Sequence, residues 1–111
     1  MTQTESIQAK VLAGEYEFSR HAVGQLLRRH ISVQEVREAI ASSQVIEDYS
    51  DDKYGPSCLL LGCTQSSRSL HIQCSYPSRS LVKVITAYEP DVNQWVDLKT
   101  RKETEKENGS S

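Results

Sequence analysis

The strongest constraint on the fold is a series of four β-rich segments at residues 45–49, 57–61, 70–76 and 81–88. They are rich in β-branched, aromatic and leucine residues, and the spacing of the apolar residues shifts from the helical period towards two. The breaks between them, residues 50–56, 64–69 and 77–80, are short and polar. Breaks of this length join antiparallel neighbours, because a parallel crossover needs about a dozen residues or more. We therefore expect a meander of four antiparallel strands.

Helical patterns precede these strands. The first helix is expected over residues 4–13 and ends at Gly14, which suits the position after a helix. Residues 16–18 form a brief extended piece. Ser19 can cap a second helix that runs to about His30.

A third helix begins with the sequence Ser32-Val-Gln-Glu35, which is a capping box. It is expected to stop near residues 42–43. Helices followed by strands predict an α+β domain, with two to three N-terminal helices packed on one face of a four-stranded antiparallel sheet. The other face is then partly open and is a natural place for a site.

Length and composition indicate one domain. The chain has 111 residues, and residues 99–111 contain no apolar side chain. We expect a single α+β domain over residues 1–98, closed at one edge by Trp95, and a disordered polar tail over residues 99–111. The longest apolar run, residues 58–61, is far shorter than the ~20 residues of a membrane helix, and the first ten residues lack a secretory pattern. A cytoplasmic location is therefore expected.

Charge is segregated along the chain. The net charge at pH 7 is −2, which gives no global attraction to nucleic acid. Residues 19–30 and 68–86 carry basic residues without acids, whereas residues 47–52 carry four carboxylates. A local basic surface is compatible with this pattern. Three cysteines, an odd number, are expected as thiols rather than as a disulfide framework.

Several enzyme classes are disfavoured by missing motifs. The chain has no Gly-rich phosphate loop, no His-Glu-x-x-His, no Gly-x-Ser-x-Gly and no Cys-x-x-Cys. The histidines, arginines and hydroxyls that remain suit metal-free cleavage of RNA by its own 2′-hydroxyl. That reaction needs a base for the 2′-hydroxyl, an acid for the leaving 5′-oxygen, and cationic donors for the phosphate.

Two histidines are candidates for the acid and the base. His21 lies in the first turn of its helix, where the helix dipole favours a neutral imidazole. His71 lies on the polar side of its strand. The alternatives are a helix-entry histidine that bonds a loop carbonyl and an exposed sheet residue, respectively.

Hydroxyls and arginines complete the candidate site. Thr86 and Tyr88 share one side of the last strand, so both hydroxyls can donate to one phosphate. Arg28, Arg29 and Arg68 are the candidate cations that bind the substrate phosphate. The alternatives are residues that simply suit a strand, and a solvated helix face.

Neither the carboxylates nor the cysteines predict a metal site. The carboxylates of residues 47–52 are interpreted as a solvated acidic turn, because turns favour Asp for backbone reasons. A zinc site would use Cys58 and Cys63 with His71 and Cys74, but this spacing is unusual and Cys74 alternates into the expected core. We expect no metal ion and no cofactor.

Several short motifs follow one another along the chain. They are Phe18-Ser-Arg-His21-Ala22, Arg29 with Ile31-Ser32, Val45-Ile-Glu-Asp-Tyr49 with Asp52, Pro56-Ser-Cys-Leu-Leu-Leu-Gly62, Arg68-Ser-Leu-His71, and Ile85-Thr-Ala-Tyr-Glu-Pro-Asp91 with Trp95. This ordered set, over about residues 16–101, resembles a bacterial family of domains of unknown function, DUF4258. The family commonly has arginine at the position of Gln25 and glycine at that of His30.

Members of that family look like RelE-type toxins of the barnase, colicin and RelE ribonuclease group, whose genes often lie beside one for a zinc-ribbon antitoxin of the MqsA/YgiT kind. The resemblance implies a RelE-like fold and metal-independent cleavage of RNA. It also implies that the site is lined by His21, His71, Thr86 and Tyr88.

The sequence thus leads to a hypothesis and two rivals. The hypothesis is a metal-independent endoribonuclease toxin of a type II toxin–antitoxin system, in which His21 and His71 share the acid and base roles. Its partners would be RNA and a zinc-ribbon antitoxin. The first rival is a catalytically inactive module with the toxin fold that binds a protein partner, and the second is a small metal-binding regulator.

Overall fold

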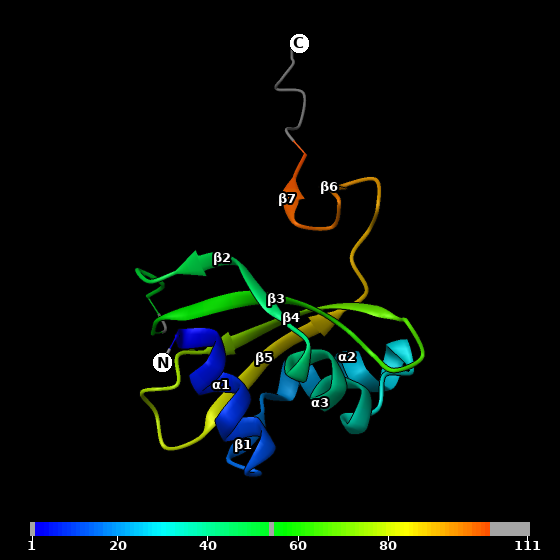
Figure 1. Ribbon diagram of the computed structural model, residues 1–111. Coiled ribbons are helices and arrows are strands. Elements are labelled where there is room, and N and C mark those ends of the chain that lie inside the picture. The colour runs from blue at the N-terminus through cyan, green and yellow to red at the C-terminus, as the bar shows by residue number, and fades with distance from the viewer. Residues whose placement is uncertain (1, 54, 103–111) are drawn as a thin grey trace.

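The computed structural model describes residues 2–53 and 55–102, which form an α+β fold with three helices and two sheets (Figure 1). In chain order the elements are α1 (Gln3–Leu12), β1 (Tyr16–Phe18), α2 (Arg20–Arg29), α3 (Val33–Ala41), β2 (Gln44–Tyr49), β3 (Ser57–Cys63), β4 (Ser69–Ser75), β5 (Val82–Tyr88), β6 (Trp95–Val96) and β7 (Thr100–Arg101).

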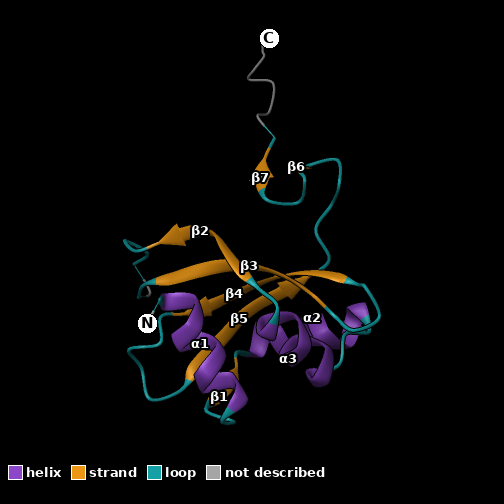
Figure 2. Cartoon of the chain, in the orientation of Figure 1, coloured by secondary structure: helices purple, strands orange, loops and turns teal. Residues whose placement is uncertain are grey.

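The large sheet has the strand order β1-β5-β4-β3-β2, and the three helices cover one of its faces (Figures 1 and 2). The hairpin of β6 and β7 lies on the opposite side of the sheet (Figure 2). The core lies between helices and sheet, and its helical side is made by Ile7, Val11, Ala22, Leu26, Val36, Ala39 and Ile40. Its sheet side is made by alternate residues of β3 and β4 and by Val82, Val84 and Ala87 of β5, where a register shift interrupts the alternation. Thr86 and Tyr88 therefore lie on the helix-free face with His71 and Gln73.

The expected four-stranded antiparallel sheet below N-terminal helices is wrong. The large sheet has five strands and is mixed, because β1 pairs in parallel with β5 through Tyr16 and Val82, Glu17 and Lys83, and Phe18 and Val84. β1 also lies between α1 and α2, so helices and strands are not separated along the chain. The expectation failed because a three-residue strand is too short to show a period and finds its partner far away in sequence.

The local signals for helix ends are confirmed. The Ser19 hydroxyl accepts a hydrogen bond from the Ala22 amide at 3.0 Å, and Ser32 and Glu35 form the expected capping box. The second helix ends at His30, which has a left-handed backbone with φ 54°. Glycine is the residue that adopts this conformation most easily, which explains physically why a glycine suits this position.

The chain continues as a hairpin beyond the expected end of the domain at residue 98. β6 pairs with β7 through Trp95 and Arg101 and through Val96 and Thr100. The first residues of the expected tail are therefore part of this hairpin, and residues 103–111 lie outside the described part of the chain. Among the described helices, none has the length and apolar character needed to cross a bilayer.

Candidate functional site

The helix-free face of the sheet carries a group of polar side chains. On this face His71 of β4 lies beside Tyr88 of β5, and Gln73 lies beside Thr86. The Thr86 hydroxyl is 3.4 Å from the side-chain oxygen of Gln73, to which it donates. Three of the four sequence-derived catalytic candidates, His71, Thr86 and Tyr88, therefore lie together, while their catalytic roles stay predictions.

His71 is fully buried between the sheet and the hairpin. Its Nε2 is 2.6 Å from the Leu98 carbonyl oxygen, and its Nδ1 is 3.3 Å from the Tyr88 hydroxyl. The indole of Trp95 meets the imidazole edge to face, with ring centroids 4.3 Å apart. Because a carbonyl only accepts, Nε2 carries the hydrogen and Nδ1 accepts from Tyr88.

Burial sets the protonation state of this pair. It lowers the pKa of His71, and the hydrogen bond to the Leu98 carbonyl and the nearby charge of Glu47 offset this only in part. Burial also raises the pKa of Tyr88. Near neutral pH the site therefore holds a neutral imidazole, which can take up a proton, beside a hydroxyl that can donate one.

Two charged residues that the sequence analysis missed border His71. Arg101 of β7 pairs with Glu47 of β2, with 3.3 Å between Nε and Oε2. Its guanidinium lies 4.7 Å from the centre of the Trp95 ring. Glu47 also accepts a hydrogen bond from Tyr49, and burial together with this bond raises the pKa of Tyr49 to about 12. The alternation of Glu47 and Tyr49 along one strand was an available signal, whereas nothing local pointed to Arg101.

His21 lies in the first turn of α2, a helix that packs against β5, and is exposed. The flanking residues fix this place: the Ser19 hydroxyl donates to the Ile85 carbonyl at 2.9 Å, and the Gln25 side-chain oxygen accepts from the Ala87 amide at 2.8 Å. Within the described residues, His21 has no hydrogen bond or ion pair through its side chain and does not contact His71. Gln25, 7% exposed, thus bonds the backbone of β5.

Arg28 and Arg29 of α2 are both exposed, as expected for a helix surface. The guanidinium of Arg28 folds back over Gly24, close to where a Cβ at that residue would lie. In the described part of the chain neither arginine forms an ion pair. Both guanidinium groups are therefore available to an anionic ligand from the helix side of the molecule.

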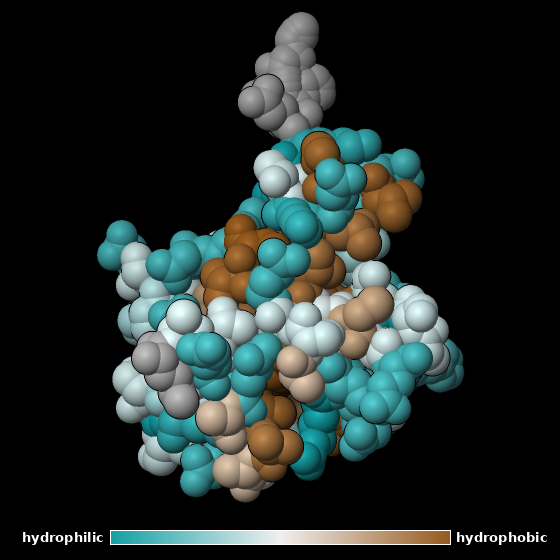
Figure 3. All heavy atoms as spheres, in the orientation of Figure 1, coloured by the Kyte–Doolittle hydropathy of each residue, from teal (hydrophilic) through white to brown (hydrophobic). Residues whose placement is uncertain are grey.

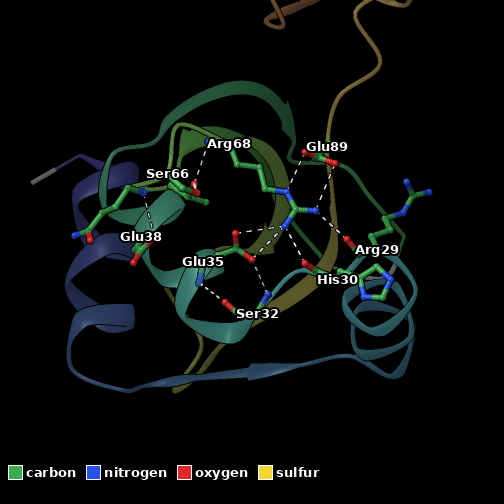
Figure 4. Close-up of polar contacts among 10 residues, drawn as sticks. Arg29, His30, Ser32, Glu35, Glu38, Ser66, Arg68 and Glu89 are labelled. Carbon is green, nitrogen blue, oxygen red and sulfur yellow. Dashed lines mark hydrogen bonds and ion pairs between the residues drawn. The ribbon is translucent and has the colours of Figure 1, made fainter.

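Arg68, the third candidate cation, is fully engaged (Figure 4). It binds the Glu89 carboxylate at 2.9 Å and the Glu35 carboxylate at 3.2 Å. It also donates to the carbonyls of Arg29 and His30, both at 2.8 Å. Its guanidinium thus joins the end of α2 to the start of α3 and the end of β5, on the helix side rather than beside His71. A phosphate could reach it only in competition with two carboxylates.

A cleft of about 540 Å³ opens beside the Glu47–Arg101 pair, lined by Asp48, Tyr49, Ser50, Asp51, Asp52, Gln73 and Arg101. In the structure as described, no three His, Cys, Asp or Glu side chains gather closely enough to hold a metal ion. Of the residues considered for zinc, Cys74 lies in the core below the sheet, whereas the ring of His71 faces the hairpin. The donor set therefore does not fit a metal centre at His71.

One comparison with known proteins gives a match. The family model described as "Domain of unknown function (DUF4258)" matches residues 18–89. This stretch begins at the end of β1, includes all of β5 and contains His21, His71 and Tyr88. No curated protein and no solved structure matches the chain.

Proposed function

The chain belongs to the DUF4258 family, and we propose that it is a metal-independent endoribonuclease whose site is the helix-free sheet face around His71. The observation that carries the proposal is a fully buried histidine outside the hydrophobic core, hydrogen-bonded to a tyrosine. A neutral imidazole supplies one of the two proton-transfer groups that cleavage of a phosphodiester requires, and the Tyr88 hydroxyl bonded to it can orient the phosphate.

The proposed reaction is attack of an RNA 2′-hydroxyl on its own phosphate. The 2′-hydroxyl loses its proton to a base, a new O–P bond forms, and the bond from phosphorus to the 5′-oxygen breaks. The leaving oxygen takes a proton from an acid, and the products are a 2′,3′-cyclic phosphate and a 5′-hydroxyl. His71 serves as one of the two proton-transfer groups, and the Tyr88 and Thr86 hydroxyls orient the phosphate.

The second proton-transfer group has two candidates. His21 is the sequence-derived candidate, and RNA lying across the first turn of α2 would meet it there. Glu47 is the rival candidate, because it lies on the same side of the sheet as His71. Its partner Arg101 contacts the Trp95 ring, and that ring contacts the imidazole of His71. Arg101 also brings a cation to this face, and Arg28 and Arg29 supply others to a bound strand at the helix surface.

The biological setting is part of the same proposal. We infer a toxin of a type II toxin–antitoxin pair that acts on RNA in the cytoplasm and is neutralised by a zinc-ribbon antitoxin. The support is the family resemblance, and the test is co-purification with the product of an adjacent gene that encodes two Cys-x-x-Cys pairs.

A protein-binding module without catalysis is the second candidate function. It is favoured by the full engagement of Arg68 and by the hairpin that covers His71. This alternative predicts that a protein partner binds equally well when His71 is replaced.

Cleavage of a labelled RNA by the purified protein tests the proposal. We expect His71→Gln to lower the rate by about 10²–10⁴-fold, since one proton-transfer group is lost. His30→Ala, at an exposed histidine, is the matched control and should leave the rate unchanged. His21→Ala and Glu47→Gln assign the second group, and a chelator should have no effect. Equal cleavage by His71→Gln and the unmodified protein would refute the role of His71.

A further inference from the structure

The hairpin over His71 is a narrow cover, here called the strap and defined as residues 95–101. The contacts that hold it to the large sheet include the Leu98 carbonyl on His71 Nε2 and the Trp95 ring on the imidazole. Arg101 adds an ion pair with Glu47 and a hydrogen bond with Tyr49. Clefts flank it on both sides, one of about 540 Å³ beside Arg101 and one of about 220 Å³ beside Leu98. Trp95 is buried, whereas residues 96–101 are exposed or half-buried, so the strap packs on the sheet mainly through this one ring and otherwise through polar contacts.

The space-filling view shows the same arrangement. Apolar surface is gathered at the base of the hairpin, between it and the body of the molecule, and hydrophilic surface surrounds it (Figure 3). The surface between the strap and the large sheet is thus apolar, and the cleft beside Arg101 is polar. Lifting it would expose the Trp95 ring and the imidazole of His71 together.

The turn of the strap is strained. Asp97 and Leu98 have left-handed backbones, with φ 51° and φ 64°, and the Lys99 amide bonds the Val96 carbonyl across them at 2.9 Å. Two left-handed residues in such a two-residue turn are typical of a type I′ hairpin, in which Gly strongly suits the second position. A leucine there disfavours the turn by about tenfold. The contact from His71 to the Leu98 carbonyl opposes this strain.

We propose that the strap is a reversible autoinhibitory cover that must lift from His71 before a substrate can reach the site. The closed form is stabilised by the imidazole hydrogen bond, the ring contact, and the bonds of Arg101 to Glu47 and Tyr49. The Arg101 side chain is 60% exposed. The left-handed backbone of Leu98 in the turn lowers the stability of the closed form. That the strap excludes RNA rests on the proposed ribonuclease function. That the strap opens and closes does not depend on that function.

Chemical modification of histidine by diethyl pyrocarbonate measures the opening without any RNA. His21 and His30 are exposed and serve as internal standards within the same protein, whereas His71 is fully buried. We expect His71 to react more than about tenfold slower than either standard. Equal rates for the three histidines would overturn the proposal.

Two variants should move this rate in opposite directions. Arg101→Ala removes the ion pair to Glu47 and should speed modification of His71 by up to about fivefold, the usual range for a partly exposed pair. Leu98→Gly relieves the turn and should slow modification by about tenfold relative to Leu98→Ala. The alanine variant loses the same side-chain contacts but keeps the Cβ, so the glycine–alanine difference isolates the strain.

Two further measurements separate the strap from other causes. The chain has one tryptophan, and fluorescence of Trp95 should lie further to the red in Leu98→Ala than in Leu98→Gly, because both variants keep the Arg101 contact on the indole. Urea unfolding of each variant shows whether His71 reacts only through global unfolding; rates that follow global stability alone would overturn the proposal.

An RNA arm distinguishes the two proposals. Leu98→Gly should cleave more slowly than Leu98→Ala if both are right. Altered His71 reactivity without cleavage in any variant would leave the strap standing and refute the ribonuclease. RNA cleavage together with a His71 modification rate that is unchanged by the Leu98 and Arg101 substitutions would support the ribonuclease and refute the strap as a cover.

Discussion

Arg68 and His71 are three positions apart, and each binds the carbonyl of a left-handed residue that is not glycine. Arg68 holds the carbonyl of His30, at the end of α2, and His71 holds that of Leu98, in the strap. Arg68 adds two carboxylates and a second carbonyl, whereas His71 adds a hydroxyl and two ring contacts.

This difference separates a permanent junction from a releasable one. The Arg68 cluster joins two helices and a strand through charged hydrogen bonds, which are the strongest kind in proteins. The imidazole of His71 bonds only uncharged groups, and the nearby ion pair of Arg101 and Glu47 is partly exposed. The same local geometry can thus fix a helix connection at one place and hold a removable segment at another.

The largest expected effect is at the Arg68 cluster. Arg68→Ala leaves Glu35, Glu89 and two carbonyls without their shared partner, and we expect the free energy of unfolding to fall by about 2–3 kcal/mol. Urea denaturation measures this. Arg28→Ala, at an exposed arginine without an ion pair, is the control and should stay within about 0.5 kcal/mol. A loss at Arg68 no larger than that of the control would contradict the comparison.

A smaller effect, of opposite sign, is expected at His30. His30→Gly keeps the carbonyl that binds Arg68 and removes the Cβ from a left-handed position, so the free energy of unfolding should rise by about 0.5–1 kcal/mol. Thermal unfolding followed by circular dichroism measures it. His30→Ala keeps the Cβ and should give no such gain; equal stability of the two variants would show that the backbone there is not strained.

The smallest expected effect is that the two clusters lose their contribution to the free energy of unfolding in different pH ranges. The pKa of His71 is lowered from 6.5 by burial, so the unfolded chain binds the extra proton more tightly and stability falls as the pH drops below about 6.5. The pKa of Glu35 is lowered from 4.5, mainly by its bond to the Ser32 amide and then by Arg68, so its contribution is complete above 4.5 and is lost below.

Urea midpoints from about pH 7 to pH 3 should therefore show two separate declines. His71→Gln should abolish the upper decline and leave the lower one. His30→Ala is the control for the upper window. An upper decline that persists in His71→Gln would assign it to another group.

The sequence predicted those parts of the fold that depend on neighbouring residues. Ser19, Ser32 and Glu35 cap helices through bonds that span three residues, so local spacing is enough to identify them. The pairing of β1 with β5 was missed because its partners lie far apart in sequence. The β6–β7 hairpin was missed because two-residue strands show no period and its turn carries Leu98 instead of glycine.

Strand alternation predicted part of the candidate site, namely which residues of one strand share a face. Alternation puts Thr86 and Tyr88 on one face, and the structure has them beside Gln73 and His71. Alternation also predicts Val82 and Val84 on that face, and this is wrong, because a register shift opposite Gln73 and Cys74 leaves both valines in the core. The engagement of Arg68 was not predictable, because its partners come from three other elements. Arg101 was assigned to a polar tail, and its role depends on Trp95 and Glu47, which only the folded chain brings near.

The parallel pairing of β1 with β5 also determines when the fold can be completed during synthesis. Ser19 and Ile85, joined by a hydrogen bond at this edge, are 66 positions apart, so α1, β1 and α2 leave the ribosome long before β5 exists. β5 lies between β1 and β4 in the sheet, so its arrival joins the N-terminal edge to the meander. Ala22 and Leu26, on the helix that packs against β5, are therefore buried only by one late, long-range closure.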